Sequence, residues 1–235
     1  MEFVVINDTN LLTNYGLGLL DYSVGAPVPD IKLIDIPGRA GKLDASLALN
    51  GKLNLKSRPI TITLRTRNAD FADFHKTLTA VTTLINGAEE SRVVFSTDPE
   101  WYYKGRFLVS YSKTNAVTGQ ITLTCANAFP YKIDNSKTTC NFGDVDMTDL
   151  TTFMACNTRL YQGTNEVTFI GYEYNGPVTI YTGMQLSVTW NGTTYQLING
   201  KNYIPEIHFE EGENILTFTA PYSTYVRVVY ERGIQ

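Results

Sequence analysis

Only one stretch of this chain places its apolar residues at helical spacing. From residue 70 onward they recur every three or four positions and line one face: Phe71, Phe74, Leu78, Val81, Leu84 and Ile85. A lone amphipathic helix must bury that face against something else. The rest of the chain favours sheets, because charged residues make up only 18% and 15 tyrosines and many threonines suit a pleated, half-buried surface. The pattern predicts a mainly β, α+β protein.

The first half of the chain is predicted to place strands around this helix. Residues 60–66 alternate strictly between apolar and polar, which is typical of a half-buried strand. Further short strands are predicted at 3–6, 31–36, 43–49, 92–95, 105–111 and 120–126. Gly16, Gly18 and Gly25 fall in a stretch predicted to be irregular, without the context of a phosphate-binding loop. We expect a first domain of α+β type at residues 1–132.

The second half has almost no helical period. Short strands are predicted at 166–170, 178–181, 185–190, 193–197, 214–219 and 225–230. Asn191-Gly192 fits a two-residue hairpin because both residues tolerate positive φ, and Asn199-Gly200 and Glu211-Gly212 are further predicted turns. Residues 144–154 could be a short helix or an irregular connection. The spacing predicts a β-sandwich domain at residues 133–235.

The composition argues against several partner classes. With 19 basic and 23 acidic residues, a net charge of −4 and no basic run, the chain lacks the footprint of a nucleic-acid binder. Cys125, Cys140 and Cys156 are too scattered for a disulfide framework or a metal site, so we read them as free thiols and expect no metal and no cofactor. The N-terminus has no secretory-signal features and no apolar run approaches ~18 residues, so we expect synthesis in the cytoplasm.

Catalysis is not expected, because the chain offers few groups for it. Nucleophilic catalysis needs a base held against the nucleophile, and the only histidines are His75, beside the apolar face of the helix, and His208, in a strand-like stretch. The acidic pairs Glu89-Glu90 and Glu210-Glu211 are adjacent in predicted turns, whereas sugar hydrolysis needs carboxylates that face each other across a cleft. The sequence therefore predicts a protein that is not an enzyme.

Aromatic residues gather at two places. Trp101-Tyr102-Tyr103 follows Asp98-Pro99, and Trp190 and Tyr195 flank the Asn191-Gly192 turn. Either group could stack on sugar rings, fill a partner's pocket or belong to the core. We favour packing or subunit contact for the first group, because an exposed aromatic cluster is costly unless a partner covers it.

Several ordered segments carry a family resemblance. In the first half these are residues 36–44 (Ile-Pro-Gly-Arg-Ala-Gly-Lys-Leu-Asp), 58–62 (Arg-Pro-Ile-Thr-Ile), Asp98-Pro99 followed by 102–106 (Tyr-Tyr-Lys-Gly-Arg), and 125–132 (Cys-Ala-Asn-Ala-Phe-Pro-Tyr-Lys). In the second half they are residues 165–167, 212–218 and 230–233. Together, and in this order, they span nearly the whole chain. The sequence resembles the distal tail (Dit) proteins of siphophages.

The resemblance implies a structural protein of the virion. In that family the first domain forms a six-fold belt under the last ring of tail tube protein and carries the tail tip, and the second domain is a galectin-like sandwich that projects outward. The implied partners are further copies of the chain in a hexameric ring, the tail tube protein, the tail-associated tip protein and a receptor-binding protein. DNA is expected to pass through the lumen of the tail-tip ring without specific binding, which suits the mildly acidic balance.

The same resemblance suggests residues for subunit contacts or for the structural motif. These are Arg39, Gly41, Asp44, Arg58, Asp98, Tyr103 and Arg106. Gly41 is expected to supply a backbone shape that other residues cannot reach, and Asp44 an acceptor for a neighbouring subunit's amides.

Two rival functions stay open. A host-surface carbohydrate-binding adhesin would use Trp101, Tyr102, Trp190 or Tyr195 as stacking residues. However, the chain lacks the His-x-Asn-x-Arg and Trp-Gly-x-Glu-x-Arg arrangements of sugar-binding galectins and the length of an inserted carbohydrate-binding module. A tail-associated hydrolase is opposed by the scarcity of histidine.

Overall fold

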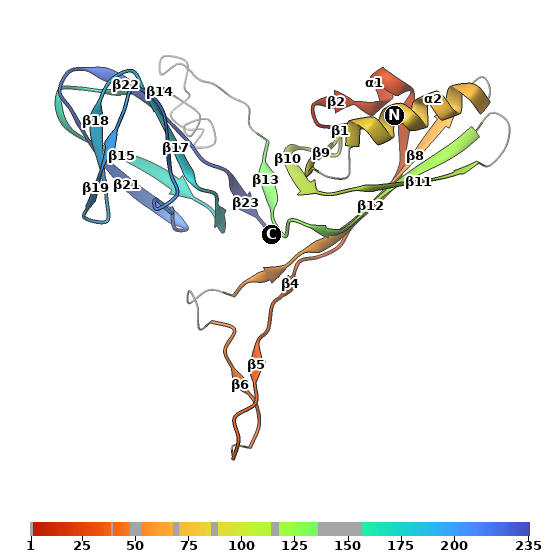
Figure 1. Cartoon of the computed structure of the whole chain (residues 1–235), viewed down its shortest axis with the longest axis horizontal. Helices are drawn as coiled ribbons and strands as arrows, with labels where there is room; N and C mark the ends of the chain where they lie inside the picture. The colour runs from red at the N-terminus through yellow and green to blue at the C-terminus, as the bar shows by residue number, and fades with distance from the viewer. Residues whose placement is uncertain are drawn as a thin grey trace. The chain divides into compact units, whose positions relative to one another are not determined.

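The structure is a computed structural model that describes residues 2–38, 40–47, 53–67, 71–85, 89–113, 118–135 and 157–235. Strands dominate, which confirms the predicted mainly β class, and the described part contains two helices (Figure 1). The chain divides into two compact units, residues 1–132 with Gln235 (unit 1) and residues 133–234 (unit 2). The stretch at 144–154, predicted as a helix or a connection, lies outside the described residues. No helix within the described ranges is long and apolar enough to cross a membrane.

The first sheet of unit 1 has four antiparallel strands. Their order is β11 (Leu108–Lys113), β12 (Thr118–Ala128), β8 (Arg58–Arg67) and β3 (Leu17–Val24). The predicted alternation of β8 is confirmed, since Ile60, Ile62 and Leu64 are buried. The irregular stretch predicted around Gly18 is wrong, because β3 pairs with β8 from Leu17 to Val24. Only Leu17 of this strand is fully buried, so its sequence carries no alternation to reveal it.

The second sheet of unit 1 contains β10 (Asp98–Gly105), β9 (Ser91–Phe95), β1 (Val4–Ile6) and β2 (Thr9–Asn10), in this order. A short helix, α1 (Leu11–Tyr15), begins at Asn10, whose side chain accepts two backbone N–H bonds, and ends at Gly16 with φ +67°. The strand predicted at 105–111 is wrong: β10 ends at Gly105 and β11 begins at Leu108. Between them Phe107 is buried in the core, so the apolar run belongs to two strands and the turn between them.

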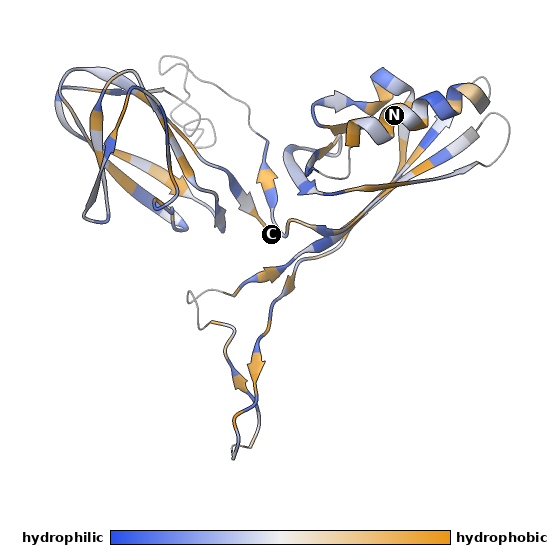
Figure 2. Ribbon diagram, in the orientation of Figure 1, coloured by the Kyte–Doolittle hydropathy of each residue, from blue (hydrophilic) through white to orange (hydrophobic). Residues whose placement is uncertain are grey.

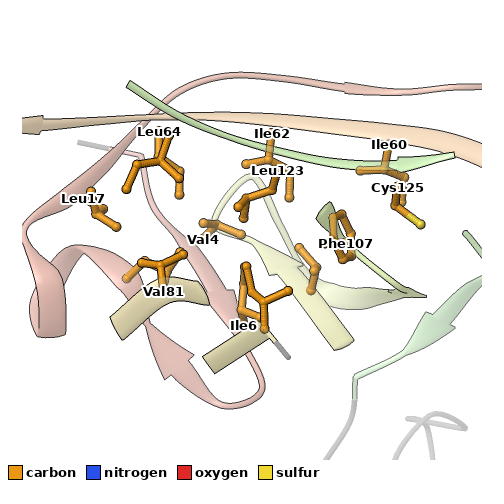
Figure 3. Close-up of a cluster of buried hydrophobic side chains, with 14 of the residues drawn as sticks. Val4, Ile6, Leu17, Ile60, Ile62, Leu64, Val81, Phe107, Leu123 and Cys125 are labelled. Carbon is orange, nitrogen blue, oxygen red and sulfur yellow. The ribbon is translucent and has the colours of Figure 1, made fainter. Parts of the chain in front are cut away.

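The predicted amphipathic helix is confirmed as α2 (Phe71–Ile85). Its apolar face packs into a core to which both sheets contribute, with Val81 of α2 beside Val4 and Ile6 of β1 and Leu64 of β8 (Figure 3). Burying such a side chain contributes about 1.5–3 kcal/mol, so this shared core holds the helix and both sheets of unit 1 together.

Unit 2 is the predicted β-sandwich. One sheet has the order β14 (Asn157–Leu160), β22 (Thr224–Val229), β17 (Val178–Thr182) and β20 (Gly200–Ile204). The other has the order β15 (Gly163–Gly171), β21 (Gly212–Ala220), β18 (Leu186–Trp190) and β19 (Thr193–Leu197). Buried residues from all eight strands form one core. The predicted Asn191-Gly192 hairpin is confirmed, with φ +46° and +79° and Trp190 opposite Thr193.

Three further short strands lie at or beyond the boundary between the units. β13 (Lys132–Asp134) spans the boundary between the units. Within unit 2, β16 (Tyr174–Asn175) pairs with β23 (Arg232–Ile234). Here Arg232 is buried and forms a close ion pair with Asp134, so the charge of a nearly enclosed guanidinium is neutralised.

The same asparagine-bridged turn occurs three times in unit 2. In residues 161–165, 198–202 and 210–214 a glycine in the third position has φ near +100°, and an asparagine closes the turn from the fifth. The Asn214 side chain accepts the Glu210 N–H at 2.8 Å and donates to the Glu210 and Gly212 carbonyls at 2.7 and 2.9 Å. Asn165 and Asn202 make the equivalent bonds. The same turn motif therefore occurs at the beginning of β15, β20 and β21.

Candidate subunit-contact site

Between β3 and β8 the described residues 25–38, 40–47 and 53–57 leave the first sheet as a two-stranded arm (Figure 1). Its base is closed by the Gly25 N–H, which donates to the Pro59 carbonyl at 2.8 Å. Along it β4 (Val28–Pro29) pairs with β7 (Leu55–Lys56), and β5 (Leu33–Ile34) pairs with β6 (Leu43–Asp44). The longer strands predicted at 31–36 and 43–49 are therefore wrong. With no third strand beside them, the pairs form only short ladders.

The arm exposes a large amount of aliphatic surface. Among the described residues, eight of the twenty exposed large hydrophobic side chains lie on it: Val28, Ile31, Leu33, Ile34, Ile36, Leu43, Leu47 and Leu53. Figure 2 shows apolar residues along both of its strands. A two-stranded ribbon has no interior of its own, and exposed aliphatic side chains that gather in one region commonly mark a surface that a partner covers. The arm has the composition of a surface that another molecule covers.

The predicted contact residues at the tip of the arm have local roles. Gly41 has φ +84° and open space around it, so the backbone conformation, and not crowding, favours glycine there. Asp44 accepts hydrogen bonds from the hydroxyl and the backbone N–H of Ser46, and these bonds lower the pKa of its carboxyl. The Asp44 carboxylate was predicted to accept hydrogen bonds from a neighbouring subunit. In the structure it already accepts hydrogen bonds inside its own turn. Arg39 lies outside the described residues.

Arg58 and Tyr103 meet at the base of the arm. Arg58 is only 4% exposed, its guanidinium donates to the Pro130 carbonyl, and its centre lies 5.7 Å from the Tyr103 ring centroid. Burial lowers the pKa of Arg58 and raises that of the Tyr103 hydroxyl. The pair ties the first residue of β8 to β10 and to the end of unit 1. Its geometry is that of a support for the arm.

Other predicted residues lie elsewhere in unit 1. Asp98 pairs with Lys132 at 3.4 Å, and the Lys132 ammonium lies 5.1 Å from the Trp101 ring. Tyr102 is buried, with the Arg92 guanidinium 4.3 Å from its ring. These contacts engage the aromatic group within unit 1, as the packing interpretation expects.

Arg106 is exposed at a hollow of about 660 Å³ in unit 1. The hollow is lined by residues of β8, β11 and β12, including Ile60, Leu108 and Cys125, with Glu90 and Arg106 as its charged members. Leu108 is 71% exposed there, which makes it an accessible apolar contact point. Hollows of about 300–1,000 Å³ with apolar walls are the usual size of binding sites.

The candidate sugar-stacking residues of unit 2 are engaged in packing. Trp190 and Tyr195 are partly buried against the core, and the Trp190 ring meets Phe209 edge-on at 5.6 Å. Phe209 in turn packs against Tyr230, whose hydroxyl donates to the Ile170 carbonyl at 2.9 Å, and burial raises the pKa of Tyr230. Trp190 therefore belongs to an aromatic cluster at the core, and Tyr195 is partly buried against the same core.

The groups considered for catalysis are dispersed. His75 lies edge-on to Tyr111, with ring centroids 6.2 Å apart, and His208 is exposed. Cys125 is a buried free thiol, whereas Cys140 and Cys156 lie outside the described residues. Within the described ranges, no three His, Cys, Asp or Glu side chains come together as metal ligands.

Comparison with solved structures decides the fold. Comparison with protein-family models and with curated proteins finds no match. The crystal structure of Dit (gp 19.1) from phage SPP1, described as a paradigm of the hub adsorption apparatus in phages that infect Gram-positive bacteria, matches over 100% of both chains with a TM-score of 0.56 at 11% identity. This chain has the Dit fold. The resemblance predicted from the sequence is confirmed at the level of the fold.

Two further matches come from the phage p2 baseplate in its activated conformation. The structure with Sr matches over 94% of this chain and 99% of its own, with a TM-score of 0.40 at 9% identity. The structure with Ca has the same coverage, with a TM-score of 0.41 at 8% identity.

Proposed function

We propose that this chain is a structural, non-catalytic protein of a phage tail tip, which assembles as a ring of six copies through unit 1. The observation that carries the proposal is the arm, which exposes eight aliphatic side chains in a chain with the Dit fold. Burial of that surface against another copy would return about 25 cal/mol per Å² of apolar area, so association is its natural outcome.

The ring follows from the kind of contact. The arm of one copy lies on a different surface of the next, so the contact is heterologous, and a heterologous contact repeated around a closed rotation makes a ring. The hollow beside Leu108 is the receiving surface in this proposal, because it is apolar and belongs to the same unit. Arg58 and Tyr103 hold the base of the arm and so fix the angle at which it reaches the neighbouring copy.

The role in the virion follows from the ring. The ring connects the tail tube protein to the tail-associated tip protein and anchors receptor-binding components, after the chain has been made in the host cytoplasm. DNA passes through its lumen without specific binding, which the net charge of −4 supports because an acidic protein does not hold phosphates.

The test is the oligomeric state of the full chain. Light scattering and negative-stain electron microscopy should find rings for the wild type and monomers for Leu33→Ser/Ile34→Ser, with the thermal midpoint of the monomer unchanged because both side chains are exposed. Ile198→Ser, at an exposed isoleucine of unit 2, is the matched control and should keep the rings. A wild-type protein that stays monomeric both alone and with purified tail tube protein, or an arm variant that still forms rings, contradicts the proposal.

A further inference from the structure

The outer face of one sheet of unit 2 combines tyrosines with cations. On β22, Val226 and Val228 point into the core, so Tyr225 and Arg227 point outward. The same alternation turns the outward residues of the neighbouring strands to this face. We call the set the tyrosine–cation face: Arg159, Tyr161, Tyr181, Lys201, Tyr203, Tyr225 and Arg227.

Rings and charges alternate across this face. Tyr181 of β17 lies opposite Arg227 on one side and opposite Lys201 on the other. In the next row Tyr225 lies opposite Arg159, whose guanidinium carbon is 5.2 Å from the Tyr161 ring centroid. Neighbouring strands are about 4.8 Å apart, so each cation lies beside a tyrosine ring. The face is a continuous platform rather than a set of isolated side chains.

The charges of the platform have no counterpart within it. The outward positions of its four strands hold no carboxylate, and Arg159, Lys201 and Arg227 form no ion pair within the described part of the chain. The Nε of Arg227 is enclosed and, among the described residues, meets no hydrogen-bond acceptor. In a chain of net charge −4, three cations that are unpaired among the described residues give this sheet face a local positive charge. Their complement is an acidic partner.

We propose that the tyrosine–cation face docks a separate protein that presents carboxylates to it. Tyrosine and arginine are among the residues most enriched in the energetic centres of protein interfaces. A platform on the outside of a sandwich suits a protein surface, whereas small ligands prefer concave sites. Three cations in an acidic chain would neutralise only a few phosphates, and phosphate neutralisation supplies nearly all of the non-specific affinity for nucleic acid, so a polyanion is the weaker candidate.

The chemistry of the face also sets the kind of association. Tyrosine hydroxyls and guanidinium groups stay hydrated when the face is free, so it needs no permanent cover and suits a reversible partner. The source of that partner rests on the proposed function: it is another protein of the same tail tip. Its attachment uses unit 2, whereas the ring uses unit 1, so the two associations are measured separately.

The test titrates the full chain with each of the other tail-tip proteins encoded with it, purified singly, by isothermal calorimetry. One of them should bind, and Arg227→Glu and Lys201→Glu should each weaken that binding at least tenfold. Tyr181→Ser should weaken it several-fold, whereas Tyr222→Ser, at an exposed tyrosine outside the face, should leave it unchanged. A Glu→Lys variant of the partner that restores binding to Arg227→Glu would identify the facing carboxylate.

Several results would overturn the inference. These are that no purified tail-tip protein binds, that binding ignores all three face variants, or that Arg227→Glu abolishes self-association of the chain. Equally contrary is binding of poly(glycerol phosphate) or oligo-dT that depends on the same residues, because the ligand is then a polyanion. Lys201 is exposed, so its variant keeps the test decisive if Arg227→Glu fails to fold. Face variants that lose the partner and keep rings separate this inference from the proposed function.

Discussion

The arm of unit 1 and the tyrosine–cation face of unit 2 are both rich in exposed large side chains, but their chemistry differs. Among the described residues, the eight exposed on the arm are all aliphatic, whereas five of the eight exposed in unit 2 are tyrosines. An aliphatic side chain forms no hydrogen bond with water, so covering the arm is favourable. An exposed tyrosine keeps its hydroxyl hydrated, so it can remain exposed to water until a partner binds. The difference in chemistry matches the two proposals, a permanent contact between copies through the arm and a reversible contact with a partner through the face.

The difference is also structural. The arm is a two-stranded ribbon with no core, so its exposed residues can bury themselves only against another molecule. The tyrosine–cation face lies on a sheet whose inner side is already packed, with Val226 and Ile180 buried beneath it. Without a partner the arm is therefore expected to be less ordered, because few buried contacts hold it. The face is expected to keep its conformation, because the core of unit 2 supports it.

The largest effect is expected from a cysteine pair that tests where the arm is covered. In a chain with Cys125, Cys140 and Cys156 changed to Ala, Ile34→Cys and Leu108→Cys are made as separate proteins. Mild oxidation of their mixture should give a disulfide-linked dimer on non-reducing gels, because the proposed ring seats the arm of one copy on the hollow beside Leu108 of the next.

Each single variant alone is the control and should give no such product. Leu33→Cys, one residue away on β5, allows for the direction of the side chain, since neighbouring residues of a strand face opposite ways. If ring-forming mixtures link through neither position 33 nor position 34, the arm is covered elsewhere.

A smaller effect is expected from the asparagine-bridged turns, and it tests whether the two units act independently. Asn214 is 3% exposed and makes three hydrogen bonds within a partly buried turn, so Asn214→Ala leaves the Glu210 N–H and the Glu210 and Gly212 carbonyls without these partners. It should lower the free energy of unfolding of unit 2 by about 2–4 kcal/mol. Asn202→Ala changes the same motif where it is partly exposed and should cost less.

Each unit carries one of the two tryptophans, which makes the measurement selective. Urea melts of Trp101→Phe protein report on unit 2 through Trp190, and melts of Trp190→Phe protein report on unit 1 through Trp101. Rings should persist in Asn214→Ala, because the arm belongs to unit 1. If that variant loses its rings, the assignment of ring formation to unit 1 is wrong.

Sequence patterns predicted those elements that bury one face. α2 and β8 were found because Val81 and Ile62 recur in register with a core, at periods of 3.6 and 2. β3 was not predicted as a strand, because it is defined by its pairing with β8 and not by an alternating buried face. The bridged turns were readable, since residues 161–165, 198–202 and 210–214 share a glycine followed two residues later by asparagine. Only Asn199-Gly200 and Glu211-Gly212 were recognised as turns, and the bridging asparagine was missed.

The candidate surfaces were less accessible to sequence reasoning. The positive φ of Gly41 is a conformation that its residue type favours. The expected subunit contact of Asp44 did not take into account that its carboxylate accepts a local hydrogen bond from Ser46. Alternation alone would have placed Tyr225 and Arg227 on one side of a strand. That Tyr181 lies between Arg227 and Lys201 depends on pairings across at least twenty residues, which no local pattern contains.

The finest test of the comparison is ionic strength. Between 50 and 500 mM NaCl the screening length falls from roughly 14 to 4 Å, so contacts between exposed charges weaken. Binding of the acidic partner through Arg159, Lys201 and Arg227 should therefore fall about tenfold in calorimetric titrations. Aliphatic burial carries no such dependence, so the ring should keep its mass in sedimentation runs at both salt concentrations. Rings that dissociate in 500 mM NaCl would mean that charge, and not the aliphatic arm, holds the copies together.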